Sequence, residues 1–232
     1  MINFENNDRR PEEIRLTTSL VGQSIEVQKG NRVLQRSALY FGEIKGTNMP
    51  EKGSFAKSRF LTAIEKIARE EDFWIEDLSS MVGEKFPGGQ ESEVFATKDR
   101  KDVIKLNRFS FIGNNLLGVV TFIERINTHN ALFPTDSYEI VGFSRDSQNN
   151  TCIVLKQPYA EGDEATQKDI DEFFEAVGAE KKRSGVYILG DYEINDALPN
   201  NVIKGKMGGL HFIDTFSINK LRIKEIQDIW QM

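Results

Sequence analysis

Apolar residues recur at helical spacing in two long stretches of the chain. Residues 54–71 place them three or four positions apart behind the helix cap Ser54, which predicts a helix on Phe60, Leu61, Ile64, Ile67 and Ala68. Residues 114–129 predict a second helix, whose stripe consists of Leu116, Val119, Val120, Ile123 and Ile126. Shorter helices are expected at 75–82, at 169–177 and at 218–230.

Strands are expected between these helices. Runs of apolar and β-branched residues predict four of them, at 92–97, 102–106, 138–144 and 151–156. Two more short strands should flank residues 196–201. Nearer the N-terminus, polar and apolar residues alternate around Lys29-Gly30-Asn31, which predicts a hairpin turn, and residues 47–54 have the composition of a linker. The pattern as a whole predicts an α+β protein.

The composition is that of a globular protein with one large domain, or with one domain and a small extension. The chain has 232 residues, of which 39% are hydrophobic, and its 16 Phe are enough to fill a core. The formal net charge of −6 provides no basic footprint for nucleic acid, so no nucleic-acid partner is expected.

The sequence shows no signal for a membrane or for secretion. No apolar run approaches the length of a membrane-spanning helix, and the polar N-terminal residues do not contain the apolar segment of a secretory signal. The single cysteine, Cys152, lies in an apolar run and is expected to be a buried thiol. We therefore expect a cytoplasmic protein that does not associate with a membrane.

Three polar residues in the last third of the chain have the types and the order that phosphoryl transfer requires. Asp196 opens the segment Asp-Ala-Leu-Pro-Asn-Asn-Val, Asn201 follows within it, and Asp214 ends a second apolar run. One carboxylate would take or orient the proton of an attacking hydroxyl, while the Asn and the other Asp would hold magnesium ions that bridge nucleotide phosphates. The alternative for Asp196 is a turn cap before Pro199.

At these residues the chain resembles the protein-kinase-like superfamily, and most closely the kinase domain of bacterial polyvalent proteins, which phages and mobile elements encode. Four further motifs carry the resemblance in the family's order: Gly-Gly-Gln-Glu-Ser-Glu-Val at 88–94, His-Asn-Ala-Leu-Phe-Pro at 129–134, Gln157-Pro158 and Ile213-Asp214. The resemblance covers about residues 70 to 216. It implies a two-lobed fold with an antiparallel five-stranded small lobe, and ATP and Mg²⁺ as cofactors.

The resemblance also implies roles for two charged residues outside the catalytic segment. Lys105, between apolar neighbours on the strand 102–106, would contact the nucleotide phosphates, and Glu124 on the long helix would pair with Lys105. In this scheme Asp196 is the catalytic base, and Asn201 and Asp214 hold the metal. Without the resemblance, Lys105 could equally be a surface lysine, and Glu124 a solvated helix residue beside another cation.

The glycine-rich motif would hold the phosphates of the nucleotide. Gly88 and Gly89 would let the backbone approach the phosphates closely, and Ser92 and Val94 would continue the nucleotide site. The two glutamates of the motif place negative charge near the phosphates, so they must point away or be offset by cations. The alternative is an ordinary turn that leads into a strand.

The motif Gln157-Pro158 would form the hinge beside the adenine ring. Proline has no backbone N–H, so the adenine contacts would use carbonyl groups and the amide of a neighbour such as Tyr159. The alternative is that Pro158 does no more than end a strand, and the sequence does not choose between the two.

The sequence departs from the ordinary kinase pattern in three respects. Ile-Asn stands before Asp196 where kinases have His-Arg, Asp-Thr-Phe replaces Asp-Phe-Gly, and only 18 residues follow Asp214. We therefore expect a large lobe with little surface for a peptide. The expected organisation is an N-terminal extension at 1–54, then a kinase-like domain at 55–232 made of a small lobe at about 55–156, a hinge at 157–162 and a strongly reduced large lobe at 163–232.

The resemblance implies an ATP- and magnesium-dependent phosphotransferase that acts on a small molecule or on a partner that completes the site. The departures favour a second hypothesis, a nucleotide-binding pseudokinase that serves as an interaction module and does not catalyse. A structural protein that binds no nucleotide and an enzyme that transfers AMP are further alternatives.

Overall fold

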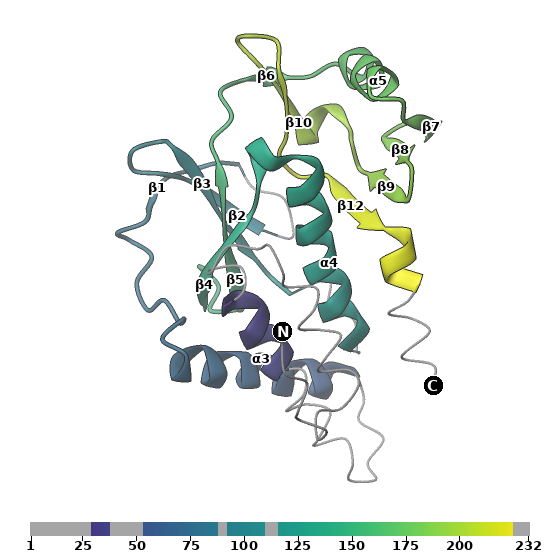
Figure 1. Ribbon diagram of the computed structural model, residues 1–232. Helices are drawn as coiled ribbons and strands as arrows, with labels where there is room; N and C mark the ends of the chain where they lie inside the picture. The colour runs from purple at the N-terminus through teal and green to yellow at the C-terminus, as the bar shows by residue number, and fades with distance from the viewer. Residues whose placement is uncertain (1–28, 38–52, 88–91, 110–115, 225–232) are drawn as a thin grey trace, which may run out of the picture.

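The computed structural model of the protein describes residues 29–37, 53–87, 92–109 and 116–224 (Figure 1). They form a mixed α+β protein, as the sequence pattern predicts, and the sheets are antiparallel. The largest sheet has five strands in the order β1-β2-β3-β5-β4. These strands are β1 Val82–Lys85, β2 Ser92–Thr97, β3 Asp102–Asn107, β4 Glu139–Arg145 and β5 Thr151–Pro158.

The two faces of the five-stranded sheet bury different side chains, because successive residues of a strand point to opposite sides. On β3, Ile104 and Leu106 are buried in one cluster with Cys152 and Val154 of β5, and the segment before β1 packs on it. Lys105 lies between Ile104 and Leu106 and therefore points to the opposite face.

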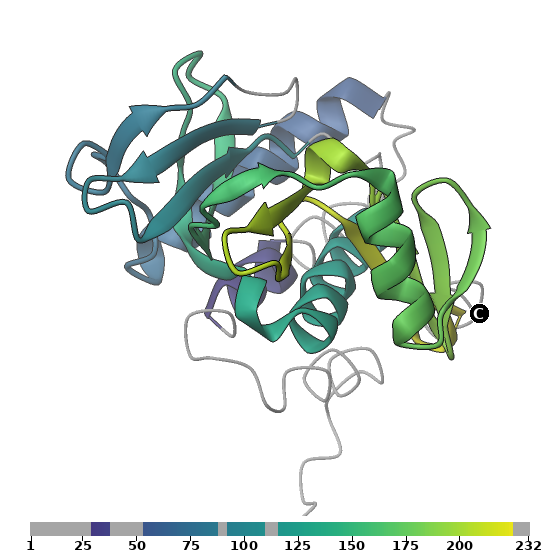
Figure 2. The ribbon, with the colours of Figure 1, turned by 90° about the horizontal axis from the view of Figure 1, so that it is seen from above.

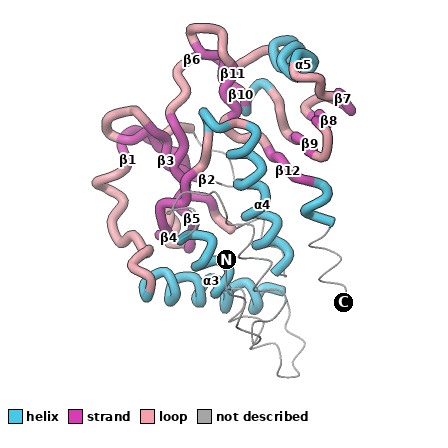
Figure 3. The backbone as a smooth tube through the Cα atoms, in the orientation of Figure 1, coloured by secondary structure: helices cyan, strands magenta, loops and turns pink. Residues whose placement is uncertain are grey.

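Helices cover this opposite face of the sheet (Figure 3). They are α3 Gly53–Glu70 and α4 Leu116–Leu132, which is followed by the short 3-10 helix η1 Pro134–Asp136. Apolar residues at helical spacing on α3 and α4 form one core cluster with β4 and β5: Phe60, Ile64, Ile67, Val119, Phe122, Ile123, Ile126, Ile140, Phe143, Ile153 and Leu155. The two long helices predicted from the hydrophobic pattern are thereby confirmed.

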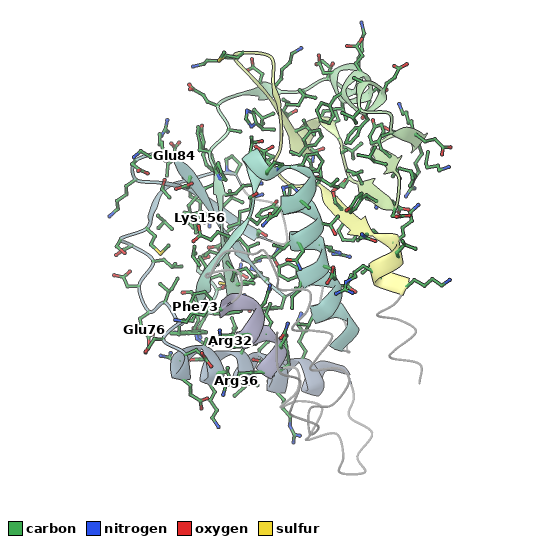
Figure 4. All side chains as sticks on the ribbon, viewed as in Figure 1. Arg32, Arg36, Phe73, Glu76, Glu84 and Lys156 are labelled. Carbon is green, nitrogen blue, oxygen red and sulfur yellow. The ribbon has the colours of Figure 1, made fainter. Side chains whose placement is uncertain are left out.

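Residues 29–37 are helical, so the hairpin turn predicted around Lys29-Gly30-Asn31 is wrong. Val33 and Leu34 have no exposed surface and belong to the same cluster as α3 and α4. Arg32 and Arg36, labelled in Figure 4, form ion pairs with Glu71 at the end of α3. A β-carbon on Gly30 would lie 2.4 Å from Ile140 Cγ2, so the glycine serves close packing and not a turn.

The remaining chain forms two smaller sheets, with α5 Gln167–Ala176 packed beside them (Figure 2). A three-stranded sheet has the order β11-β10-β6 and a four-stranded sheet the order β12-β9-β8-β7. The strands are β6 Gly162–Glu164, β7 Glu180–Arg183, β8 Val186–Leu189, β9 Tyr192–Asn195, β10 Val202–Gly205, β11 Leu210–Phe212 and β12 Phe216–Asn219, and the 3-10 helix η2 Pro199–Asn201 precedes β10. Phe174, Tyr187, Ile194 and Phe212 lie at the centre of their common core.

Local sequence signals set the ends of α5. Thr166 and Asp169 form a reciprocal capping box at the start of α5, and Gly178, with a φ of 78°, follows its end. The helix predicted at 169–177 is thereby confirmed. The helix predicted at 75–82 is not formed: Trp74 and Ile75 pair with Phe143 of β4, residues 79–81 form a turn, and β1 begins at Val82. None of the helices in the described ranges is long and apolar enough to cross a membrane.

Candidate functional site

A cavity of about 640 Å³ opens between the five-stranded sheet and the three-stranded sheet. Its lining comes from β2, β3 and β5 of the larger sheet, from β6 and β10 of the smaller one, and from the segments beside them. It includes seven residues that the sequence predicts for the site: Ser92, Val94, Lys105, Gln157, Tyr159, Asn201 and Asp214. Glu124 and Asp196 do not line the cavity. The predicted contribution of Gly88 and Gly89 falls outside the described residues.

Lys105 is buried, with 8% of its surface exposed, and its ammonium faces the segment that contains Asp214. Lys105 Nζ lies 3.6 Å from Asp214 Oδ1 and 3.3 Å from the Tyr138 hydroxyl, and it donates to the Ile213 carbonyl. Burial lowers the pKa of the Lys105 ammonium, but Tyr138 and Asp214 raise this pKa by more, so it lies above its usual value. Lys105 therefore brings a positive charge to the cavity.

The expected ion pair between Lys105 and Glu124 is not formed in this structure. Glu124 is 7% exposed, and its Oε1 lies 3.9 Å from Nε of Arg222, in the helical residues that follow β12. On the next position of α4, the Arg125 guanidinium lies 3.3 Å from the centre of the Phe216 ring. This part of α4 therefore faces β12. Spacing along the sequence places Glu124 on the helix but does not fix which side of the helix faces Lys105.

Asp196 follows β9 in a strained loop. Its φ of 58° lies in the left-handed region, which residues other than glycine seldom adopt and which is often found at functional sites. The Asp196 carbonyl accepts hydrogen bonds from Asn201 Nδ2 and from the Leu198 amide, both at 2.9 Å. The Asp196 side chain is exposed, and no other described residue binds its carboxylate.

Asn201 and Asp214 lie on adjacent segments, because the Ile213 amide donates to the Asn201 carbonyl at 3.0 Å. Asn201 is 5% exposed, and its Oδ1 accepts one hydrogen bond from Asn200 at 2.8 Å, which leaves a second lone pair for another partner. The Asp214 side chain is 71% exposed and lines the cavity. Two hard oxygen donors on adjacent segments fit the ligand preference of magnesium.

Glu93, which lies in the described part of the glycine-rich motif, points away from the cavity. Glu93 does not line the cavity, and its Oε1 lies 3.3 Å from Lys85 Nζ and 3.5 Å from Arg108 Nη2. Burial raises the pKa of Glu93, but hydrogen bonds from Ser147 and Lys85 lower this pKa by more, so it lies below its usual value. The charge of Glu93 is thus offset by cations outside the phosphate position.

The segment after β5 differs from the expected hinge. β5 continues to Pro158, and the Tyr159 amide donates to the Lys101 carbonyl at 2.8 Å, so the expectation that this amide is available to adenine is wrong. The Tyr159 ring stacks on Phe86, with ring centres 6.2 Å apart. Gln157 is 2% exposed, and its side-chain amide donates to the Asp136 carbonyl at 2.7 Å. Strand pairing and this amide contact were not visible in the sequence.

The sequence model of a family described as a serine/threonine/tyrosine kinase found in polyvalent proteins matches residues 57–220, well over half of the chain. The chain belongs to this kinase family. No curated protein matches it. The family that the sequence motifs indicate is thereby confirmed.

A buried polar cluster of this kinase joins three of its motifs, and its central residue, Asp136, is not among those that the sequence predicts for the site. Asp136 is 3% exposed, and its carboxylate accepts from the Phe212 amide at 2.9 Å and contacts His211 Nδ1 at 2.8 Å. Its carbonyl accepts from Gln157 and lies 3.1 Å from His129 Nε2. The end of α4, the end of β5 and the strand before Asp214 are thereby held together.

His129 gives this cluster a dependence on pH. Burial lowers the pKa of His129 from 6.5 to about 4, because an imidazolium is costly in the interior. Below pH 6.5 His129 binds a proton in the unfolded chain, but in the native state it stays neutral down to about pH 4. The free energy of unfolding should therefore fall by about 2 kcal/mol between pH 7.5 and pH 5. Urea unfolding at the two pH values measures this loss. His129→Gln should lose much less, and an equal loss in both proteins would contradict the assignment.

Proposed function

We propose that this kinase binds ATP with magnesium and transfers a phosphoryl group to an acceptor hydroxyl. The observation that supports the proposal best is that Lys105 and Asp214 meet 3.6 Å apart at a cavity which Asn201 also lines. A cation for phosphate oxygens and two oxygen donors for a metal therefore face the same space. The volume of about 640 Å³ lies in the range of small-molecule sites.

The proposed nucleotide orientation follows from the distribution of apolar and charged lining residues. Val94 and Val103 of the five-stranded sheet and Ile203 of β10 offer apolar surface to the adenine ring, and Phe86 adds an aromatic side chain. Ala160 lines the cavity, and its amide donates to no residue in the described ranges. Ala160 is therefore a better candidate than Tyr159 for the backbone donor to adenine.

Each charged residue has a proposed role in phosphoryl transfer. The Lys105 ammonium would hold phosphate oxygens by charge-assisted hydrogen bonds, which are stronger than neutral ones. Asn201 and Asp214 would hold magnesium, which neutralises phosphate charge when it is bound. The exposed Asp196 would orient the acceptor hydroxyl and accept its proton, whether a small molecule or a partner protein carries that hydroxyl. Ser92, inside the glycine-rich motif, begins β2 and lines the cavity.

The architecture supports a two-lobed arrangement for this function. In our proposal the five-stranded sheet with α3 and α4 is the small lobe, and the two smaller sheets with α5 are the second lobe. The cavity lies between the two sets of elements, and residues 157–162 connect them. A ligand held between two such units is a common arrangement in proteins.

A second candidate is a nucleotide-binding pseudokinase. Two observations favour it: Glu124 pairs with Arg222 and not with Lys105, and the Asp196 side chain does not line the cavity. Both candidates require nucleotide binding, and they differ only in turnover.

The test is the thermal stability of the protein with and without magnesium-ATP, followed by an assay of turnover. A ligand at 100 times its dissociation constant stabilises a protein by about 2.7 kcal/mol, so a clear rise in melting temperature is expected. Formation of ADP should accompany the rise, whereas release of pyrophosphate would indicate AMP transfer. A rise without turnover would support the pseudokinase, and no rise at saturating nucleotide would overturn both candidates.

A further inference from the structure

The Lys105 ammonium has an unexpected neighbour in this structure, the phenol of Tyr138. Lys105 Nζ lies 3.3 Å from the Tyr138 hydroxyl and 5.2 Å from the centre of its ring. The same hydroxyl donates to the Ile213 carbonyl at 2.6 Å, and this carbonyl also accepts from Lys105. The lysine, the tyrosine and the residue before Asp214 therefore form a closed triangle of hydrogen bonds.

Tyr138 is itself held firmly by the end of α4. The Asn130 side chain accepts from the Tyr138 amide at 2.7 Å and donates to the Tyr138 carbonyl at 2.8 Å. The Tyr138 ring packs against His129, with ring centres 4.7 Å apart, and 9% of the residue is exposed. A hydroxyl with both its backbone and its ring fixed can determine the position of a flexible lysine side chain.

From this geometry we infer that Tyr138 is the positioning residue for Lys105 and couples the lysine to the Ile213-Asp214 segment. The inference rests on the proposed function, because it assigns Tyr138 to the nucleotide site. Tyr138 does not line the cavity, so it acts through Lys105 and not on the substrate. It takes the position at the ammonium that the family resemblance assigns to Glu124.

The chemistry of a phenol differs from that of a carboxylate in this position. Burial raises the pKa of the Tyr138 hydroxyl above its usual value, so the group is neutral and remains a donor at neutral pH. A neutral partner orients the ammonium without cancelling its charge. The full positive charge of Lys105 is then available to Asp214 and to the phosphates of a bound nucleotide.

The test is a double-mutant cycle of Tyr138→Phe and Lys105→Ala, with both kcat and the KM for ATP measured. Loss of a group that orients a functional residue typically costs about 10- to 100-fold, so Tyr138→Phe should lower kcat by that factor and change KM by less than about threefold. The double variant should be no worse than Lys105→Ala, because Tyr138 acts only through the lysine.

Tyr187→Phe is the matched control. Tyr187 is also buried, with 1% of its surface exposed, and it does not line the cavity. Its hydroxyl donates to Asp171 and accepts from Gln167 Nε2 at 3.0 Å. This variant should lose stability as Tyr138→Phe does while its kcat and KM stay unchanged. A merely structural role for Tyr138 would give both variants the same kinetic result.

The outcomes separate this inference from the proposed function. A kcat of Tyr138→Phe equal to that of the wild type, beside an impaired Lys105→Ala, would overturn the inference and leave the proposed function intact. Additive losses in the double variant would also overturn it. If Lys105→Ala changes neither turnover nor nucleotide affinity, both are overturned. If the protein binds nucleotide without turnover, the same cycle is measured on the dissociation constant of magnesium-ATP, with a loss of about tenfold expected for either single variant.

Discussion

Asp214→Asn should abolish most phosphotransfer while leaving the protein folded. The substitution keeps the shape of the side chain but removes the negative charge that would hold the metal. Metal ions contribute several kcal/mol to the stabilisation of a transition state, and a loss of about 4 kcal/mol lowers kcat about a thousandfold. The Asp214 side chain is 71% exposed, so its ion pair with Lys105 contributes less than about 1 kcal/mol to the free energy of unfolding.

The measurement combines steady-state kinetics, urea unfolding and the rise in melting temperature with magnesium-ATP. The part of that rise that depends on magnesium should disappear in Asp214→Asn. Asp191→Asn is the matched control, because Asp191 is also exposed but lies in the turn between β8 and β9 and does not line the cavity. A magnesium-dependent rise as large as that of the wild type would contradict the role of Asp214.

Asp136→Ala should cause the largest loss of stability among single substitutions at the site. Asp136 is 3% exposed and binds both the buried Phe212 amide and His211. Hydrogen bonds to a charged group contribute about 1.5 to 3 kcal/mol, and a buried donor that loses its acceptor pays a desolvation cost as well, so we expect a loss of about 3 kcal/mol. Urea unfolding at pH 7.5 measures the change.

Asp136→Asn provides the comparison for this second prediction. The amide retains an oxygen that can accept from the Phe212 amide, so this variant should lose about half as much stability as Asp136→Ala. If both variants lose less than about 1 kcal/mol in the free energy of unfolding, the cluster around Asp136 does not hold the five-stranded sheet to β11.

Much of the candidate site could be predicted because residue type and order are local properties of a sequence. The place of Lys105 on a strand after the glycine-rich motif of the family indicates its role, Asp214 ends an apolar run, and the structure brings these two side chains to 3.6 Å. Asn201 was identified by its place after Asp196, and the hydrogen bond of 2.9 Å between its side chain and the Asp196 carbonyl reflects that local spacing. Their catalytic roles remain predictions.

The interactions that sequence reasoning missed are those between segments distant in the chain. Tyr138 precedes β4 and looks like an ordinary core tyrosine until the fold places its hydroxyl beside Lys105. The partner of Glu124 depends on the rotation of α4 against β12, and Arg222 lies in a part of the chain that the pattern assigned to a separate helix. The amide of Tyr159 is consumed by strand pairing with Lys101, which depends on the register of β3 and β5.

The fully buried Val33 and Leu34 have a consequence for how such a kinase unit can move between proteins. The family pattern begins at residue 57, yet these two side chains lie among the core residues of α3, α4 and β4. The region that matches the family is therefore shorter than the part of the chain that packs into this core. A gene rearrangement that transplants this kinase into another protein would have to carry the helical residues 29–37 with it, or supply other apolar groups for the same space.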